Sequence, residues 1–151
     1  MSAASNLLVR KLEVDDFGKG FLALLAQLTT VGRVNQDEFT GRWWELNDNP
    51  DYYIAVAEDT SKSQLLGTAA LIIERKFIHS CGKVGHIEDV VVDEAARGHN
   101  LGHRLIDELV RVARQQGCYK VILDCAEHNI PFYEKCGLSR KEVQMVKYLD
   151  R

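Results

Sequence analysis

The chain has 151 residues, a length that fits one domain with one hydrophobic core. A hydrophobic fraction of 46% and a charged fraction of 27% are ordinary for a soluble globular protein, and no apolar run approaches the ~18 residues of a membrane span. The formal net charge of -3 argues against a protein that binds nucleic acid.

The four cysteines show no C-x-x-C spacing, and the first residues lack the basic and apolar regions of a secretory signal. We therefore expect free thiols in a reducing compartment, the cytoplasm, without excluding an organelle. A zinc site is not expected, because the spacing around His79, Cys81 and His86 offers no convincing third and fourth ligand.

The chain begins with a strand and a helix. Residues 7–12 alternate in a pattern that is typical of a short strand. Asp15 or Asp16 can cap a helix with apolar residues at helical spacing, which ends within residues 29–32.

A second helix and two strands follow. Asn35 and Glu38 form a capping-box pattern that predicts the start of the helix. Residues 52–58 and 64–77 predict two strands joined by a turn, and residues 79–83 predict a loop into the next strand. This half of the chain is therefore expected to form an antiparallel meander.

The central stretch, residues 86–92, is a short run of Ile and Val that predicts a buried strand and contains Glu88 and Asp89. Adjacent strand residues point to opposite faces, so only one of these carboxylates is expected to face any given cleft. Residues 97–102 then form a glycine-containing turn that opens an amphipathic helix ending near Gly117. Unpaired backbone N–H groups at such a helix start can hold an anion. A phosphorylated cofactor beside a proton-handling group is therefore expected here.

The last part of the chain predicts a strand over residues 119–125, parallel to the central strand. Asn129 is expected to cap a short helix with Pro131 near its start, and residues 143–149 predict a last strand. No repeat, low-complexity segment or boundary divides the chain. We therefore predict a single α/β (α+β) domain over residues 1–151, with a mixed sheet that is antiparallel in its N-terminal half.

Several segments carry a resemblance. Arg97-Gly98-His99-Asn100-Leu101-Gly102 resembles the R/Q-x-x-G-x-G/A pyrophosphate loop of the GNAT acetyltransferase superfamily, with Asn100 where glycine is usual. Residues 129–137 resemble a second segment of that superfamily. An ordered set of further segments is similar to one family, the glucosamine-6-phosphate N-acetyltransferases: residues 28–32, 77–79, 81–82, 85–89, 117–125 and 132–137. The resemblance implies a GNAT fold, in which helices flank the sheet and its parallel strand pair is splayed.

The resemblance implies acetyl-CoA as co-substrate. Its pyrophosphate would lie on the amides of residues 97–102, and its pantetheine arm would run along the Val-rich strand. The cofactor-binding residues implied are Val90, Val91, Val92, Arg97, Gly98, His99, Asn100, Leu101, Gly102, Asn129 and Tyr133. Asn is the next best residue after Gly for the left-handed backbone conformation. The loop is therefore expected to keep its conformation with Asn100 in place of the usual glycine.

The implied reaction is attack of an amine on a thioester carbonyl. Glu88 and Asp124 are the candidates for orienting the amine, with one of them acting as base directly or through water; which one remains open. Tyr133 resembles the tyrosine that lies beside the thioester sulfur and would protonate the departing thiolate. Asp89 can contribute through its backbone or through its carboxylate.

The resemblance also implies residues that bind the sugar phosphate. They are Thr29, Lys76, His79, Glu88, Asp89, Asp124, Lys147 and Tyr148. Lys147 stands near a position where the family usually offers Arg, and Lys is a point charge without the bidentate fork. The family works as a homodimer whose last strand crosses between subunits and whose sugar sites lie at the interface, and we expect the same here.

The leading hypothesis is acetylation of the 2-amine of glucosamine 6-phosphate. A GNAT enzyme for another amine, such as a polyamine or a protein N-terminus, remains an alternative, as does a non-catalytic sensor that binds acyl-CoA. Lys76, His79 and Lys147 favour an anionic substrate, and the presence of both Glu88 and Tyr133 speaks against a sensor. Neither nucleic acid nor a membrane is expected as a partner.

Overall fold

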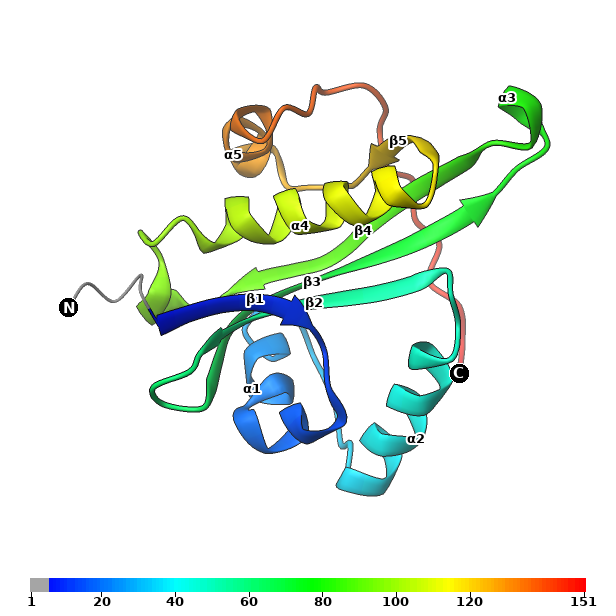
Figure 1. The fold of residues 1–151 in the computed structure, drawn as a ribbon. Coiled ribbons are helices and arrows are strands. Elements are labelled where there is room, and N and C mark those ends of the chain that lie inside the picture. The colour runs from blue at the N-terminus through cyan, green and yellow to red at the C-terminus, as the bar shows by residue number, and fades with distance from the viewer. Residues whose placement is uncertain (1–5) are drawn as a thin grey trace.

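The computed structural model describes residues 6–151, which form a five-stranded mixed sheet with helices on both faces (Figure 1). The strand order is β1-β2-β3-β4-β5; neighbouring strands are antiparallel up to β4, and β4 and β5 are parallel. The strands are β1 Leu7–Lys11, β2 Tyr52–Asp59, β3 Gln64–Arg75, β4 Lys83–Val92 and β5 Cys118–Ile122. The predicted antiparallel half and the predicted parallel pair are confirmed.

One long helix covers one face of the sheet and two shorter ones cover the other. Helix α4, Leu101–Gln115, buries Leu105 and Leu109 completely against the sheet. On the opposite face, α1 (Phe21–Leu25) and α2 (Gln36–Asn47) form a second apolar cluster. The remaining elements are η2 Val14–Lys19, α3 Ile78–Cys81, η3 Glu94–Ala96, η4 Glu127–Asn129 and α5 Ile130–Lys135.

The first helix is shorter than the sequence predicts. Val14–Lys19 is a 3-10 turn, and Gly20 then takes a left-handed φ of 86°, which separates it from α1. A left-handed residue ends the helical path, as it does at many helix C-termini. The N-cap is Glu13, and the cap predicted at Asp15 or Asp16 is wrong because Asp16 turns inward instead.

Asp16 is fully buried and forms the centre of an ion network. It accepts hydrogen bonds from Arg10 at 2.9 and 2.8 Å and from the backbone N–H of Glu13 at 2.8 Å. Arg10 also donates to Glu58 of β2 at 2.8 Å, and Lys19 donates to Glu58 at 3.0 Å. The network ties η2 to β1 and β2 and thereby sets where α1 begins.

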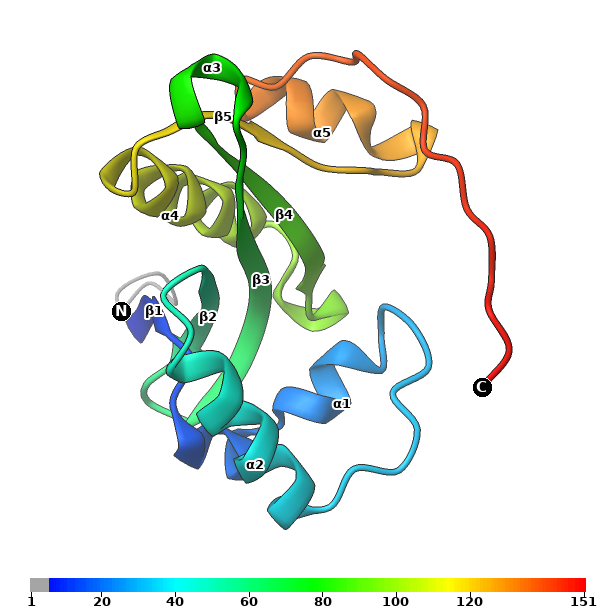
Figure 2. The same ribbon diagram turned by 90° about the vertical axis from the view of Figure 1, so that its right-hand side faces the viewer.

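The chain after α5 differs most from expectation. Residues 138–151, here called the C-terminal arm, contain no helix or strand, so the predicted strand at 143–149 is wrong for this single chain. Val143, Met145 and Tyr148 are 78%, 89% and 90% exposed. Figure 2 shows the arm leaving α5 and running along one side of the molecule. An extended segment becomes a strand only when it pairs with the free edge of another strand. In the described residues of this chain, no strand pairs with the arm.

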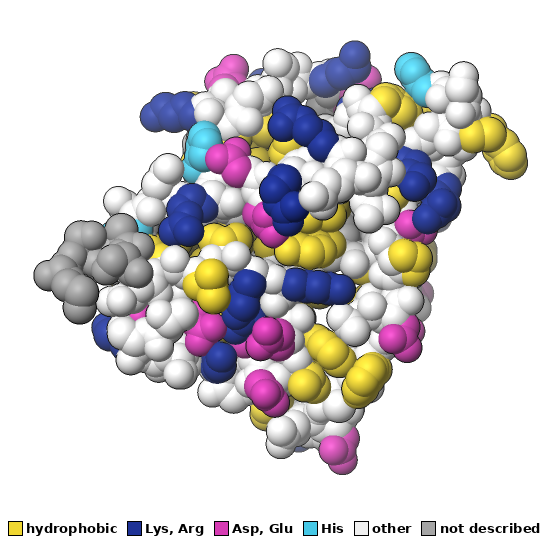
Figure 3. Space-filling view, in the orientation of Figure 1, with side chains coloured by type: hydrophobic (Ala, Val, Ile, Leu, Met, Phe, Trp, Pro, Cys, Tyr) yellow, Lys and Arg dark blue, Asp and Glu magenta, His cyan; other side chains and the backbone are white. Residues whose placement is uncertain are grey.

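The turn between β3 and β4 has an unusual backbone. His79, Ser80 and Cys81, which the sequence places in a loop, have φ values of 53°, 57° and 59° and form a single left-handed turn. This conformation costs roughly 1–2 kcal/mol per residue for a side chain with a Cβ. Phe77 and Ile78 beside it are 93% and 58% exposed. Figure 3 shows apolar side chains projecting at this end of the hairpin, at the upper right.

We expect Asp16→Ala to lower the free energy of unfolding by about 3 kcal/mol, because it leaves the partly buried Arg10 guanidinium without its main partner. Asp15→Ala, a change at the neighbouring exposed carboxylate, is the control and should shift stability by less than about 0.5 kcal/mol. Urea denaturation measures both. Equal losses in the two variants would contradict the role given to the buried network.

Candidate active site

Strand β4 is paired with β5 only over its first residues, and β5 ends where this pairing ends. The register runs from Lys83↔Cys118 to His86↔Ile122, where β5 ends. Beyond His86, β4 continues to Val92 with no pairing to β5 (Figure 2). The backbone N–H and C=O groups on this edge of β4 are therefore available to an extended ligand.

A β-bulge interrupts β4 at the acidic pair. The β3–β4 register shifts around Ala69, where two residues of β4, Asp89 and Val90, oppose one residue of β3. Asp89 has a φ of 51°, in the left-handed region. The side chains of Glu88 and Asp89 are both exposed. A bulge re-aims the side chains beside it, so strict alternation does not apply to this pair. That only one of the two carboxylates faces a given cleft therefore stays a prediction.

Glu88 of β4 lies near Asp124, which follows the end of β5. The pKa of Glu88 is raised first by desolvation and then by the negative charges of Asp124 and Asp89. His86 acts in the opposite direction. Glu88 therefore holds a proton at higher pH than an ordinary glutamate, which suits a group that accepts one during a reaction.

The C-terminal arm reaches the same place. The side-chain amide of Gln144 donates a hydrogen bond from Nε2 to Asp124 Oδ2 at 2.8 Å. No pattern in the sequence indicates this contact, because a single glutamine in a segment of alternating apolar and polar residues is not part of any motif.

Tyr133 is carried by α5 and packs beside the Phe132 ring at a centroid distance of 4.9 Å. Burial raises the pKa of Tyr133 to about 12, and the nearby Cys125 and Cys136 add to the effect. The phenol is therefore protonated at neutral pH and is able to donate a proton or a hydrogen bond.

All four cysteines of the chain are free thiols in the structure.

The turn before α4 has the backbone geometry of an anion-binding loop. Arg97, Gly98, His99 and Asn100 are exposed, and Leu101 is buried and anchors the helix. Gly98 and Asn100 have φ values of 99° and 60°, so the prediction that Asn100 can adopt the left-handed conformation is confirmed. The first N–H groups of α4 have no partner within the helix and point towards this turn.

Helices α4 and α5 touch at a glycine. A Cβ added to Gly102 would lie 2.8 Å from Cζ of Phe132, so a larger residue would displace the ring. Pro131 lies in the first turn of α5, as predicted. Asn129 stands at the N-cap position of α5, as predicted, but its φ and ψ of -93° and -6° are already helical and its side chain makes no capping bond. An N-cap residue needs extended backbone geometry to reach the following N–H groups.

A second contact that the sequence did not indicate joins the segment after α1 to the connection between β4 and α4. Gln27, just after α1, donates from Nε2 to Asp93 Oδ2 at 3.3 Å and accepts from the N–H of Glu94 at 3.1 Å. Gln27 precedes the exposed Thr29 by two residues. This glutamine therefore ties the loop of Thr29 to the connection between β4 and α4.

The residues expected to bind a sugar phosphate do not gather in one chain. Thr29 follows α1, whereas Lys76 and His79 lie at the tip of the β3–β4 hairpin, and Figures 1 and 2 place α1 and α3 at opposite ends of the molecule. Lys147 and Tyr148 are exposed in the C-terminal arm.

Two of these residues also have partners within the hairpin region. Lys76 Nζ lies 3.4 Å from a carboxylate oxygen of Glu74, whose other oxygen is 2.9 Å from His86 Nε2. The His79 ring stacks on Tyr119 at a centroid distance of 4.0 Å.

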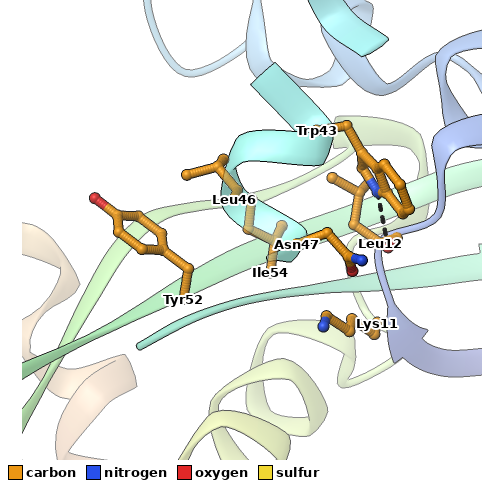
Figure 4. Close-up of a pocket in the computed structure, with 7 residues that line it drawn as sticks. All are labelled: Lys11, Leu12, Trp43, Leu46, Asn47, Tyr52 and Ile54. Atoms are coloured by element: carbon orange, nitrogen blue, oxygen red, sulfur yellow. Dashed lines mark hydrogen bonds between the residues drawn. The ribbon is translucent and has the colours of Figure 1, made fainter. Parts of the chain in front are cut away.

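A small hollow lies elsewhere, between α2 and the β1–β2 edge (Figure 4). It is lined by Lys11, Leu12, Trp43, Leu46, Asn47, Tyr52 and Ile54. Trp43 Nε1 donates to the carbonyl of Leu12 at 3.2 Å across it. None of the expected site residues lines this hollow, and the candidate site is instead the unpaired part of β4 beyond His86, with the residues that follow β5.

Among residues 6–151, no group of three or more His, Cys, Asp and Glu side chains could hold a metal ion. No helix in that part of the chain is long and apolar enough to cross a membrane.

The model of the Acetyltransferase (GNAT) family matches residues 12–138. A glucosamine 6-phosphate N-acetyltransferase of Arabidopsis thaliana is 47% identical over 97% of this chain and 99% of its own length. A glucosamine 6-phosphate N-acetyltransferase 1 of Dictyostelium discoideum is 45% identical over 93% of this chain and 89% of its own length. The crystal structure of the Arabidopsis thaliana enzyme superposes with a TM-score of 0.93 at 47% identity, over 95% of this chain and 99% of that one.

The splayed β4–β5 pair, the left-handed turn before α4 and the family match define a GNAT acetyltransferase, a class whose acyl donor is acetyl-CoA. The identity over nearly the whole chain is more specific than the fold. Within that class, this chain belongs to the glucosamine 6-phosphate N-acetyltransferase family.

We expect Asn100→Val to weaken the affinity for acetyl-CoA by about tenfold, because a β-branched residue is a genuine outlier at positive φ and would distort the turn. Asn100→Gly, which tolerates the same backbone, should bind within about twofold of the natural protein. Isothermal calorimetry measures the affinities, with melting temperatures as a check on folding. Equal affinities for all three proteins would contradict a role for this turn in binding the donor.

Proposed function

We propose that this chain transfers the acetyl group of acetyl-CoA to the 2-amine of D-glucosamine 6-phosphate, giving N-acetyl-D-glucosamine 6-phosphate and CoA. The observation that carries the proposal is the 47% identity to the Arabidopsis thaliana enzyme over 97% of this chain. The acidic cleft beside an unpaired strand edge supports it, because an amine and an extended thioester could meet there.

The donor would lie along the free edge of β4, with backbone groups of Val90, Val91 and Val92 as partners. Its pyrophosphate would bind the amides at the start of α4, where the helix dipole and the Arg97 guanidinium favour negative charge. The further residues proposed for this end of the donor are Gly98, His99, Asn100, Leu101, Gly102 and Asn129.

The acceptor amine would be oriented by Glu88 and Asp124, and one of the two would take its proton directly or through water. The raised pKa of Glu88 favours Glu88 for that role. Asp89, within the bulge, would contribute through its backbone. Tyr133, with a pKa raised to about 12, would supply the proton that the departing thiolate needs.

A homodimer would complete the phosphate site. Thr29 and the hairpin residues Lys76 and His79 lie at opposite ends of one chain, so a second copy is needed to bring such residues to one phosphate. The exposed apolar side chains of the C-terminal arm, which also carries Lys147 and Tyr148, fit a segment that pairs with a partner. Light scattering should give twice the mass of one chain, and a monomer at assay concentrations would overturn this part of the proposal.

A panel of amines tests the substrate. We expect release of free CoA thiol with acetyl-CoA and glucosamine 6-phosphate, and at least about tenfold lower kcat/KM with glucosamine, because the charged contacts to the phosphate are lost. A polyamine and a peptide N-terminus test the alternative acceptors. Equal rates with glucosamine and its 6-phosphate would contradict the phosphate site, and a preference for a polyamine would replace the proposed substrate.

The pH dependence of kcat/KM tests the base. A base must be ionised to act, so activity should fall as the pH drops through the raised pKa of Glu88, above the ordinary glutamate value of about 4.3. Asp124→Asn removes one of the charges that raise this pKa and should move the acid limb to lower pH. Glu88→Gln should abolish the limb; if the limb instead persisted in Glu88→Gln and vanished in Asp124→Asn, Asp124 would be the base.

A further inference from the structure

We infer that Gln144 is a positioning residue that holds the Asp124 carboxylate in the orientation needed to receive the amine, so that the C-terminal arm takes part in catalysis. This inference rests on the proposed function, because it takes Asp124 as a group that orients the acceptor.

The contact between the two residues is specific. Gln144 Nε2 lies 2.8 Å from Asp124 Oδ2, a short distance for an amide donor on a carboxylate. The residues on either side of Gln144 are Val143 and Met145, which are 78% and 89% exposed. Within one chain, the arm is therefore joined to Asp124 at this point by the hydrogen bond.

A second polar contact supports this part of the arm. The Nη2 atom of Arg140 lies 3.6 Å from Oε1 of Glu127. Glu127 follows Asp124 by three residues in the chain. The arm is thus tethered on both sides of residues 141–143. Such a tether limits the directions from which the Gln144 amide can approach the carboxylate.

The charge of the cleft explains why an amide suits this position. The groups facing Glu88 are the carboxylates of Asp124 and Asp89, together with His86. A lysine or arginine at 144 would hold Asp124 but would cancel part of the negative charge that attracts an amine. The neutral amide of Gln144 fixes Asp124 and leaves the charge of the cleft unchanged.

The two oxygens of the Asp124 carboxylate have different partners in this geometry. Oδ2 of Asp124 accepts from Gln144, which leaves Oδ1 to accept from an amine N–H. Because this hydrogen bond restricts rotation of the carboxylate, Oδ1 has a preferred direction before the acceptor binds. Pre-orientation of this kind acts on the rate of the chemical step more than on donor binding.

Two substitutions test the inference. Gln144→Leu keeps the approximate size and removes the donor; we expect kcat with glucosamine 6-phosphate to fall about tenfold, with KM for acetyl-CoA within about twofold of the natural protein. Gln144→Glu adds a negative charge beside Asp124; we expect a similar fall in kcat and an acid limb of the pH profile displaced to higher pH. Glu142→Gln, a change two residues away at an exposed side chain, is the matched control and should leave both parameters unchanged.

Light scattering on every variant separates positioning from assembly. A fall in kcat at unchanged mass supports the inference. An unchanged kcat in Gln144→Leu, or a fall that occurs only together with a change in mass, would overturn it.

The natural protein separates this inference from the proposed function. If it did not acetylate glucosamine 6-phosphate, the proposed substrate would be wrong, and the variants would be measured with whichever amine it does acetylate. A protein that acetylated no amine in the panel would overturn both.

Discussion

The parting of β4 from β5 after His86 is the constraint on which the rest of the site depends. Before that point β4 packs closely against its neighbours at Gly85. A Cβ on Gly85 would lie 2.9 Å from Leu71 of β3 and 3.2 Å from Val121 of β5. After it, β5 ends and β4 keeps one edge without a strand partner. A free edge inside a sheet would ordinarily invite association with another chain. Here it lies between an acidic cluster and the glycine-containing turn before α4, a position that suits an extended ligand.

The features that follow from local rules were predictable from the sequence. Helix α4 buries the apolar residues that recur every four positions, Leu101, Leu105 and Leu109. The turn before it adopts the left-handed backbone at Asn100 because short-range sterics decide which residues can do so. The antiparallel order of the first strands followed from the turns that join them. The parallel pair followed from the succession of strand, helix and strand. The resemblance to a family supplied the assignment of roles, and those roles remain proposals.

The features that the sequence did not predict depend on contacts between distant segments. Gln27 meets Asp93 across 66 residues, and Gln144 meets Asp124 across 20. The bulge at Asp89 arises from how β4 pairs with β3, and no pattern within β4 alone indicates it. The failed strand prediction at residues 143–149 has the same origin: β-propensity can be read from a segment, but a strand is a property of a pair.

The contact between Gly102 and Phe132 has a consequence for how the site can evolve. One residue opens the helix behind the anion-binding turn, and the other immediately precedes Tyr133, so the ring resting on the glycine sets the spacing between the two ends of the cleft. A larger residue at 102 is compatible with this spacing only if the residue at 132 becomes smaller. A larger residue at 102 alone is therefore expected to displace the neighbouring Tyr133 together with the Phe132 ring.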